Sequence, residues 1–210
     1  MTKRGTREMI VDVAAGLFAT VGLRRTTMET IASAAGRGRR TVYMYFRNKA
    51  EIYDAVVEME IKKITGPLSS LVRSDEPLSV ILVLYGEERA RRLNDLAGRN
   101  PLLLKDFAQG HSRVERLRDR LHRIEMKLLT PLFRRSASAS IAPGHPTPED
   151  YASLFLNLLR GNDRLLTKAD GLNETIRLSS LSAWLLLRAL ETGYPGSARE
   201  RESHPRKTVS

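Results

Sequence analysis

Residues 26–49 read TTMETIASAAGRGRRTVYMYFRNK, and this stretch decides the fold of the N-terminal region. Apolar residues recur at helical spacing over Ile31–Ala35, and Gly36 follows as a stop signal. A second short apolar face comes next, in which Val42 and Phe46 lie four residues apart. The spacing predicts two short helices joined by a glycine-containing turn, which is the arrangement of a helix-turn-helix.

The starts of these helices are indicated by their capping residues. Thr27 can act as the N-cap of the first helix, and a capping box between Thr26 and Glu29 is the alternative. The second helix is expected over residues 39–46, directly after Gly38. Its buried side consists of Val42 and Phe46, so the rest of its surface is free for another partner.

Helices are also expected on both sides of this motif. Residues 6–21 carry apolar side chains at i, i+3, i+4 and i+7 and are followed by Gly22, which predicts an amphipathic helix. Asn48 followed by Glu51 is typical of the cap of a fourth helix. Three short helices and the start of a longer one therefore fit within about the first 60 residues.

Beyond Gly66-Pro67 the pattern stays helical, and the segments lengthen. Ser, Ala, Pro and Gly over 136–148 predict a loop, and the polar tail over 196–210 is expected to be disordered. No strand alternation or internal repeat is found. The fold class is therefore predicted to be all-α, with helices over 78–97, 101–110, 112–135, 149–166 and 173–192.

The positive charge is concentrated at the N-terminal end. Residues 1–50 contain ten Lys and Arg against three acids, a net charge of +7 out of +11 for the chain. Such a segment attracts phosphate polyanions or an anionic membrane surface. Exposed arginines can bind guanine O6 and N7, and Thr and Met can contact a thymine methyl. Tyrosine hydroxyls and Lys49 at a helix N-terminus can bind phosphates.

Other classes of site find little support. The chain has no cysteine, and its four histidines are scattered, so we expect no metal and no cofactor. The longest apolar run, 80–85, is too short to span a membrane, and Glu8 and Asp12 interrupt any signal-peptide core. No phosphate loop or nucleophile motif indicates an enzyme. The protein is expected to be cytoplasmic.

Residues 7–56 resemble the DNA-binding domain of the TetR family of one-component bacterial repressors. The resemblance covers about a quarter of the chain, and it is the combination of residues with their spacing that makes it specific. The matching elements are Ala14 through Phe18, Gly22, Thr26-Thr27, Ile31-Ala32, Ala35-Gly36, Thr41-Val42-Tyr43, Tyr45-Phe46 and Lys49.

The resemblance implies a set of DNA contacts. Thr27 would cap its helix near a phosphate, Met28 and Glu29 would lie beside the groove, and Tyr43 and Lys49 would hold phosphates. The recognition positions would be Arg39, Arg40, Thr41, Met44 and Tyr45.

Two residues depart from the family pattern. Arg37 stands where a small apolar residue commonly packs the turn, and Gly38 stands where a capping Ser is common. Arg37 is therefore assigned an additional phosphate contact. Gly38 should cost only a few tenths of a kcal/mol relative to a good cap.

The resemblance also implies a second, larger helical domain that binds a small-molecule effector and dimerises. We expect a DNA-binding domain over 1–50, a fourth helix that begins at about 49 and links to the next domain, and the ligand-binding domain over 51–195. The candidate effector-pocket residues are Tyr85, Arg89, Phe107, His111, Asn157 and Trp184. The candidate dimer-interface residues are Leu154, Phe155, Leu158, Leu181, Leu185 and Arg188.

The expected function is that of a transcriptional regulator. A homodimer would place two recognition helices in successive major grooves of a palindromic DNA operator, and an effector would release it. Repression is the commoner mode in the family, and activation stays open, as does the number of dimers per operator. Two alternatives remain from the sequence: a basic amphipathic protein of a membrane surface, and an enzyme without a recognisable motif.

Overall fold

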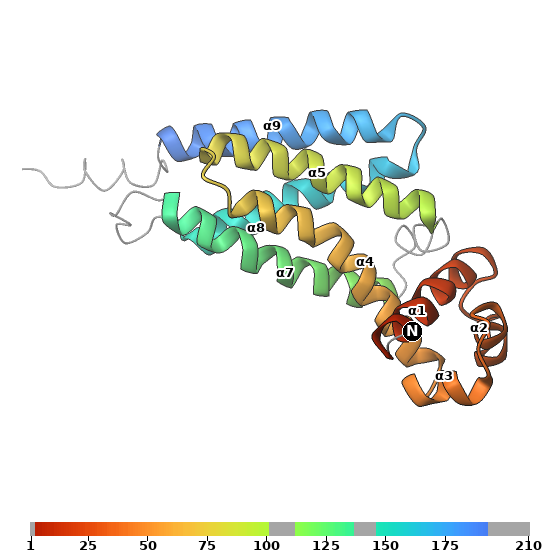
Figure 1. The fold of residues 1–210 in the computed structure, drawn as a ribbon. Coiled ribbons are helices and arrows are strands. Elements are labelled where there is room, and N and C mark those ends of the chain that lie inside the picture. Colours follow the sequence, from red (N-terminus) through yellow and green to blue (C-terminus); the bar gives the residue numbers. More distant parts are fainter. Residues whose placement is uncertain (1–2, 101–111, 137–145, 193–210) are drawn as a thin grey trace, which may run out of the picture. The chain divides into compact units, whose positions relative to one another are not determined.

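The computed structural model describes residues 3–100, 112–136 and 146–192, and within these ranges every regular element is a helix (Figure 1). The all-α prediction is confirmed. The elements are α1 (Lys3–Thr20), α2 (Met28–Ala34), α3 (Arg39–Tyr45), α4 (Lys49–Val72), α5 (Leu78–Arg99), α7 (Ser112–Ser136), α8 (Pro148–Asn162), the 3-10 helix η1 (Asp163–Thr167) and α9 (Gly171–Thr192).

The helix α4 continues through Pro67 as far as Val72. A proline inside a helix removes one backbone hydrogen bond and crowds the preceding turn. Here its neighbours Ile64 and Leu68 are fully buried, so the packing of this helix face offsets the local loss.

The segment after the 136–148 loop also differs from its prediction. The α-helix begins at Pro148, after the N-cap Thr147, and ends at Asn162. The residues that the periodicity assigned to its last turn form η1 instead. The expected helix over 101–110, nearly all of the expected loop, and the tail over 196–210 lie outside the described residues.

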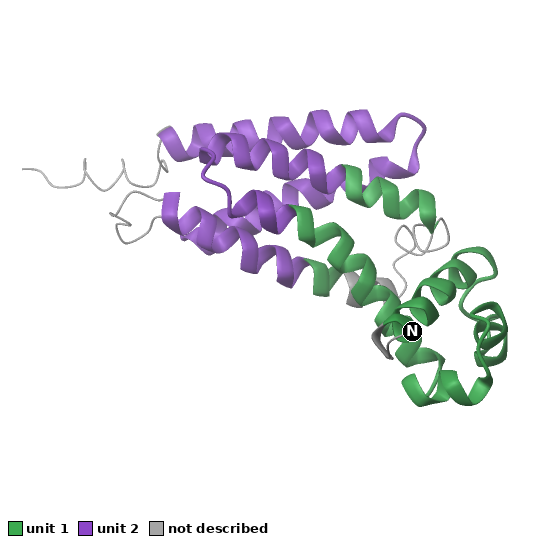
Figure 2. Ribbon diagram, viewed as in Figure 1, with its two compact units in different colours: residues 1–67, 91–121 green, residues 68–90, 122–210 purple. Residues whose placement is uncertain are grey.

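The chain divides into two structural units (Figure 2). Unit 1 comprises residues 1–67 and 91–121, and unit 2 comprises residues 68–90 and 122–210. The chain therefore changes unit inside α4, α5 and α7. The sequence places the end of the DNA-binding domain at residue 50, and that boundary stays a prediction.

The core of unit 1 is formed where α1, α2, α3 and the start of α4 meet. Val42 is fully buried and Phe46 nearly so, which confirms that these residues face inward on α3. The Arg7 guanidinium of α1 lies 5.0 Å from the centre of the Phe46 ring, a cation–π contact that links α1 to the end of α3. The buried cluster comprises Ile10, Val11, Ala14, Phe18, Met28, Ile31, Ala32, Ala35, Val42, Phe46, Ile52 and Val56.

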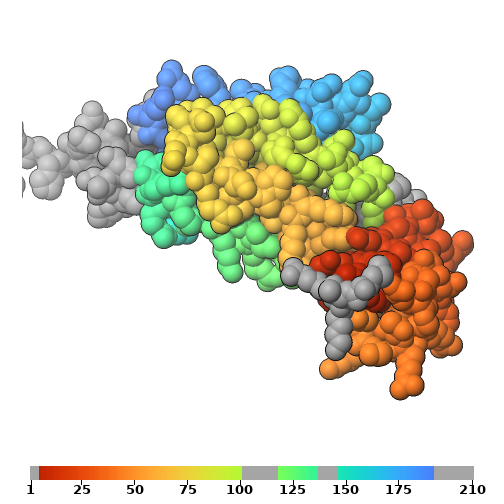
Figure 3. Space-filling view, in the orientation of Figure 1, coloured from red at the N-terminus to blue at the C-terminus, as the bar shows by residue number. Residues whose placement is uncertain are grey.

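The core of unit 2 is formed by apolar faces of α5, α7, α8 and α9. Gly86 of α5 approaches α9 so closely that a Cβ atom there would lie 2.9 Å from the Cβ of Ser179. The space-filling view shows the side chains of α5 and α9 in contact along this side of the unit (Figure 3). Glycine at position 86 therefore sets how closely the two helices pack.

Candidate nucleic-acid interface

The first helix of the motif, α2, begins with a capping box. The Thr27 hydroxyl oxygen accepts from the Thr30 backbone N–H at 3.1 Å, and the Thr30 hydroxyl oxygen accepts from the Thr27 N–H at 2.9 Å. The alternative cap, Thr26 with Glu29, is wrong. Thr26 is buried, and its hydroxyl donates to the Gly22 carbonyl oxygen at 2.9 Å.

The turn after α2 closes with two backbone hydrogen bonds of the Schellman type. The Arg37 N–H donates to the Ala32 oxygen at 2.9 Å, and the Gly36 N–H donates to the Ser33 oxygen at 3.1 Å. Gly36 has φ of 59°, a left-handed conformation that favours glycine. The turn is therefore fixed by backbone bonds, and it requires no packed side chain from Arg37, which is half-buried.

The third helix begins at the second residue that departs from the family pattern. Gly38 is the N-cap of α3 and supplies no side-chain bond, although the backbone N–H groups of Thr41 and Val42 both donate to its carbonyl oxygen. The absence of a side-chain cap leaves part of the helix N-terminus open on this side. Open backbone N–H groups at a helix N-terminus favour anions such as phosphate.

The outer face of α3 exposes the predicted recognition residues. Met44 is 72% exposed and Tyr43 44%, values far above those of the core residues. Arg39 and Arg40 are exposed as well, while Thr41 and Tyr45 are half-buried. An exposed methionine between tyrosines and arginines has no internal packing to explain it, so this face has the chemistry of a DNA-reading surface.

An ion pair crosses the motif from α3 to α2. Arg39 Nη2 lies 2.5 Å from Glu29 Oε1, and both side chains are about half exposed. Hydrogen bonds from its own backbone N–H and from Thr27, together with the charge of Arg39, hold the pKa of Glu29 below its usual range. Glu29 is thus a fixed carboxylate at the start of α2, and it orients the arginine beside it.

Two predicted DNA contacts are corrected by the structure. Met28 belongs to the buried cluster of unit 1, with 8% exposure, because it follows the cap on the inner side of α2. The Lys49 ammonium does not point freely outward. It donates to the carbonyl oxygens of Leu23 at 2.7 Å and Thr26 at 2.6 Å, with a longer bond of 3.4 Å to Arg24.

These bonds indicate a structural role for Lys49. Its three N–H donors are directed at carbonyl oxygens of the segment between α1 and α2, where the chain has no helical bonds to satisfy them. Lys49 therefore connects the start of α4 to the segment that leads into α2. Thr27 and the exposed residues of α3 keep their assignment as predicted DNA contacts, with Arg37.

The candidate effector-pocket residues are dispersed. Tyr85 is fully buried and Arg89 is 3% exposed, so these two are interior residues. Phe107 and His111 lie outside the described residues. Asn157 and Trp184 are exposed, the latter by 54%, so assigning them to an interior pocket was wrong. They lie on the exposed faces of α8 and α9. Apolar residues recur there at the same spacing as on the buried faces, so the sequence pattern does not distinguish the two.

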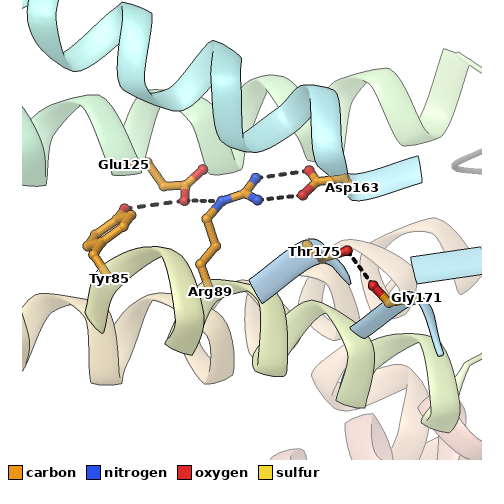
Figure 4. A network of polar contacts seen from close by, with 6 residues as sticks. All are labelled: Tyr85, Arg89, Glu125, Asp163, Gly171 and Thr175. Atoms are coloured by element: carbon orange, nitrogen blue, oxygen red, sulfur yellow. Dashed lines mark hydrogen bonds and ion pairs between the residues drawn. The ribbon is translucent and has the colours of Figure 1, made fainter. Parts of the chain in front are cut away.

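Tyr85 and Arg89 take part in a buried polar network in unit 2 that the sequence did not reveal as such (Figure 4). Arg89 Nε donates to Glu125 Oε1 at 2.7 Å, and its two terminal nitrogens donate to the Asp163 carboxylate at 2.6 and 3.1 Å. The Tyr85 hydroxyl donates to Glu125 Oε1 at 3.2 Å. The network joins α5, α7 and η1.

Electrostatics in this network follow from burial. Desolvation raises the pKa of Tyr85 well above its usual value and also raises the pKa of Glu125, although Arg89 opposes the second effect. Burial alone would lower the pKa of Arg89, but the carboxylates of Asp163 and Glu125 raise it. Arg89 therefore remains positively charged. The signal that was missed is Glu125 itself, an acid four residues from both Leu121 and Leu129 on an apolar face.

Exposed apolar side chains form stripes on α8 and α9, which pack against each other. Phe155 is fully buried, so its assignment to a dimer interface was wrong; it faces the core from the opposite side of α8. Arg188 is exposed and paired with Glu191 at 3.0 Å. The apolar members of the stripes are Leu154 and Leu158 on α8, and Leu181, Trp184 and Leu185 on α9.

Within the ranges that the structure covers, no helix is long and apolar enough to cross a membrane. Among those same residues, no group of three or more His, Asp or Glu side chains is arranged to hold a metal ion.

Known proteins match part of the chain in sequence. The family described as "Bacterial regulatory proteins, tetR family" matches residues 10–56. The HTH-type transcriptional repressor KstR2 of Rhodococcus jostii is 36% identical over 72 residues, which cover 34% of this chain and 35% of KstR2. The HTH-type transcriptional regulator TtgR of Pseudomonas putida is 40% identical over 102 residues, covering 43% and 48%. The chain thus spans about a third of KstR2 and about half of TtgR.

Solved structures extend the likeness of the fold over most of the chain. SmeT, the repressor of the Stenotrophomonas maltophilia multidrug efflux pump SmeDEF, superposes with a TM-score of 0.65 at 22% identity, covering 87% of this chain and 89% of SmeT. A complex of SmeT with triclosan gives the same TM-score at 24% identity, covering 88% and 91%. Residues 10–56 are thus similar in sequence to the tetR family of bacterial regulatory proteins, and most of the chain shares the helical fold of SmeT.

Proposed function

We propose that this protein is a DNA-binding transcriptional repressor that binds a palindromic operator as a homodimer and is released by a small-molecule effector. The observation that carries the DNA-binding part is the exposed face of α3, where Arg39, Arg40, Tyr43 and Met44 lie together on a helix held by a closed turn. Acting on DNA, the protein would work in the cytoplasm.

The charge and shape of the motif support this reading. A net charge of +7 over residues 1–50 attracts the DNA backbone without reading sequence. Arginines on α3 can then read guanines, and Met44 and Thr41 can contact thymine methyl groups. The relative KstR2 is named a transcriptional repressor, and SmeT is described as one, which favours repression.

The homodimer part of the proposal rests on the apolar stripes of α8 and α9. Leu154, Trp184 and Leu185 are each exposed by half or more, and large apolar side chains clustered on neighbouring helices favour burial against a partner. A two-fold dimer uses the same surface on both subunits. Its two α3 helices would then meet half-sites about 34–36 Å apart, one turn of DNA.

The effector part rests on the interior of unit 2 and on a related fold. SmeT has been solved with triclosan bound, so a protein of similar fold binds a small apolar molecule. In this chain, Tyr85 and Arg89 place polar groups in the interior of unit 2. An effector would release DNA only to the extent that it binds the DNA-free arrangement more tightly than the DNA-bound one.

The test is selection of bound sequences from a random duplex pool with the full chain at moderate salt. The expected result is a palindrome with half-sites one helical turn apart, bound with a steep salt dependence. Substitution of Arg40 by Ala should relax the preference at one position of each half-site. Recovery of no preferred sequence would refute the proposal, even if the protein bound DNA.

A further inference from the structure

We propose that Glu125 anchors a ligand site inside unit 2, and that this site selects small molecules with an apolar body and a hydrogen-bond donor, above all an ammonium group. The inference rests on the proposed function, since it names the class of effector. It is drawn from the bonds of Glu125, and it can be tested by ligand binding without DNA.

The two carboxylate oxygens of Glu125 are used very unequally. Oε1 accepts from Arg89 Nε at 2.7 Å and from the Tyr85 hydroxyl at 3.2 Å. Oε2 is buried and has no hydrogen-bond partner among the residues that the structure describes. A carboxylate offers about four lone-pair sites, so an entire oxygen is left without a donor there. Buried acceptors are rarely left unsatisfied in folded proteins, so we infer that a donor other than the described residues completes this one.

The charges of the network point to the same kind of partner. Arg89 is the cation of the network, and it faces two carboxylates, Glu125 and Asp163. The cluster of these three groups therefore has one negative charge in excess. Asp163 can share its charge with water because its side chain is 18% exposed, whereas that of Glu125 is 1% exposed. A positive group brought to Oε2 would balance the charge at the place where water cannot.

Protonation of Glu125 does not resolve the imbalance. Burial raises the pKa of this carboxyl, so some molecules keep the proton at pH values where an exposed glutamate has lost it. The proton would sit on Oε2, because Oε1 already accepts two bonds. A buried hydroxyl donor without an acceptor would then replace a buried acceptor without a donor. Both protonation states leave the same atom incomplete.

The surroundings define the rest of the ligand. Leu121 and Leu129 lie one turn to either side of Glu125 on α7, and both are buried. The Tyr85 ring, which carries the hydroxyl bonded to Glu125, lies 6.1 Å from the Phe155 ring. A polar atom framed by leucines and aromatic rings suits a molecule that is apolar apart from its donor.

Binding at Oε2 would also change how the helices are linked. The Glu125 charge at present holds Arg89 of α5 against α7, while Arg89 holds Asp163 of η1. A ligand ammonium would share the Glu125 charge and weaken the bond to Arg89. The network thus supplies a physical route by which a ligand alters the packing of α5 within unit 2.

The experiment uses the full chain and three probes that share one apolar body: 2-phenylethylamine, 2-phenylethanol and phenylacetate. Thermal unfolding is followed as each probe is titrated, and the carboxyl carbon of Glu125 is observed by NMR. We expect the amine to raise the melting temperature most, the alcohol less, and the carboxylate not at all. We also expect the amine to shift the Glu125 resonance.

The variant Glu125→Gln should weaken amine binding at least tenfold, because the charge is lost while the acceptor for Tyr85 and Arg89 is kept. Glu174→Gln is the matched control: it removes an exposed carboxylate of unit 2, paired with Arg177, and should leave binding unchanged. If Glu125→Gln fails to fold, the NMR shift of the Glu125 carboxyl carbon in the unchanged protein still shows whether the amine binds there.

Three results would overturn the inference: no preference for the amine, no response of the Glu125 carboxyl, or equal binding by Glu125→Gln. An internal water at Oε2 would be the remaining explanation. Such a protein could still select a palindrome from the DNA pool, so failure of the ligand site and failure of the regulator function can be told apart.

Discussion

Arg39, the first residue of α3, is ion-paired with Glu29 in the first turn of α2 at 2.5 Å, so a residue that we propose to read a base is held by a carboxylate of the neighbouring helix. Because the pair is exposed, it contributes little to stability, about 0–1 kcal/mol. Its effect is on direction: Glu29 is fixed by the cap of α2 and limits where the Arg39 guanidinium can reach.

Replacement of Glu29 by Gln should therefore relax base preference at the position that Arg39 reads, while the other positions of the operator keep theirs. Overall affinity for DNA of any sequence should rise at low salt, because a negative charge next to the phosphates is lost. Sequence selection from the random pool measures both effects. Asp12→Asn, which removes an exposed acid from α1, is the control and should leave the preferred sequence unchanged. An unaltered preference in Glu29→Gln would show that the pair has no part in reading DNA.

Replacement of Lys49 by Met should mainly destabilise the N-terminal region. The variant keeps the alkyl chain and loses the bonds to Leu23 and Thr26, so we expect a loss of about 1.5–3 kcal/mol in the free energy of unfolding. The slope of log affinity against log salt should stay near that of the unchanged protein. A phosphate contact would instead lower that slope by about 1. Arg47→Met is the control for stability: that side chain is 90% exposed, so its loss should change the free energy of unfolding little.

Replacement of Leu154 by Glu should convert the proposed homodimer into monomers. A charge placed on a buried apolar surface opposes association, and the palindromic operator should then be bound far more weakly. Sedimentation measures the oligomeric state directly. Leu84→Glu is a stringent control because Leu84 is also an exposed leucine of unit 2, but on α5. If both variants remained dimeric, the stripes of α8 and α9 would not be the interface.

Stability should depend on pH through Glu125. The pKa of this carboxyl is raised in the folded protein, so the folded state keeps a proton that the unfolded chain has released. This contribution is fully present below the unfolded value of about 4.3 and is lost as the pH rises through the folded value. Urea unfolding of the protein and of Glu125→Gln, compared from about pH 4 upward, should give a difference that changes with pH in this direction. A constant difference would show that the pKa of Glu125 does not change on folding.

Replacement of Gly86 by Ala should destabilise unit 2 by about 1–3 kcal/mol, because the new methyl group would press on Ser179 and push α5 away from α9. Gly98→Ala on the same helix has nothing within 4 Å of the new atom. Helix propensity then predicts a gain of about 0.5–1 kcal/mol. Opposite signs for the two variants in thermal unfolding would establish the close approach.

Local sequence signals predicted the motif well. Val42 and Phe46 face inward as their spacing requires, and Gly36 adopts the left-handed conformation that ends α2. Such features depend on neighbours within four or five residues, so the sequence contains their cause. The distinction between Thr26 and Thr27 as cap is finer, because both offer the same hydroxyl and only packing buries one of them.

Tertiary contacts explain what the sequence could not provide. Phe155 and Leu154 are adjacent apolar residues of α8, yet one is fully buried and the other 50% exposed. Pro67 does not end its helix, since burial of Leu68 outweighs the lost bond. Lys49 at a helix start has the pattern of a phosphate ligand, but carbonyl oxygens more than 20 residues earlier receive its protons. The burial of Glu125 could not be predicted, because α7 contains many charged residues and most of them are exposed or half-buried.

The three places where the chain changes unit have a consequence for protein engineering. The chain passes between the units after residues 67, 90 and 121, and each of these points lies within a helix. None of the three is therefore a loop at which two proteins could be joined. A chimaera joined at residue 67 would exchange residues 1–67 of unit 1 but leave residues 91–121 from the other parent. Because α4, α5 and α7 each contribute residues to both units, an exchange of unit 1 must keep all three helices continuous in sequence. The proposed DNA specificity and the proposed response to a small molecule would therefore be difficult to exchange separately.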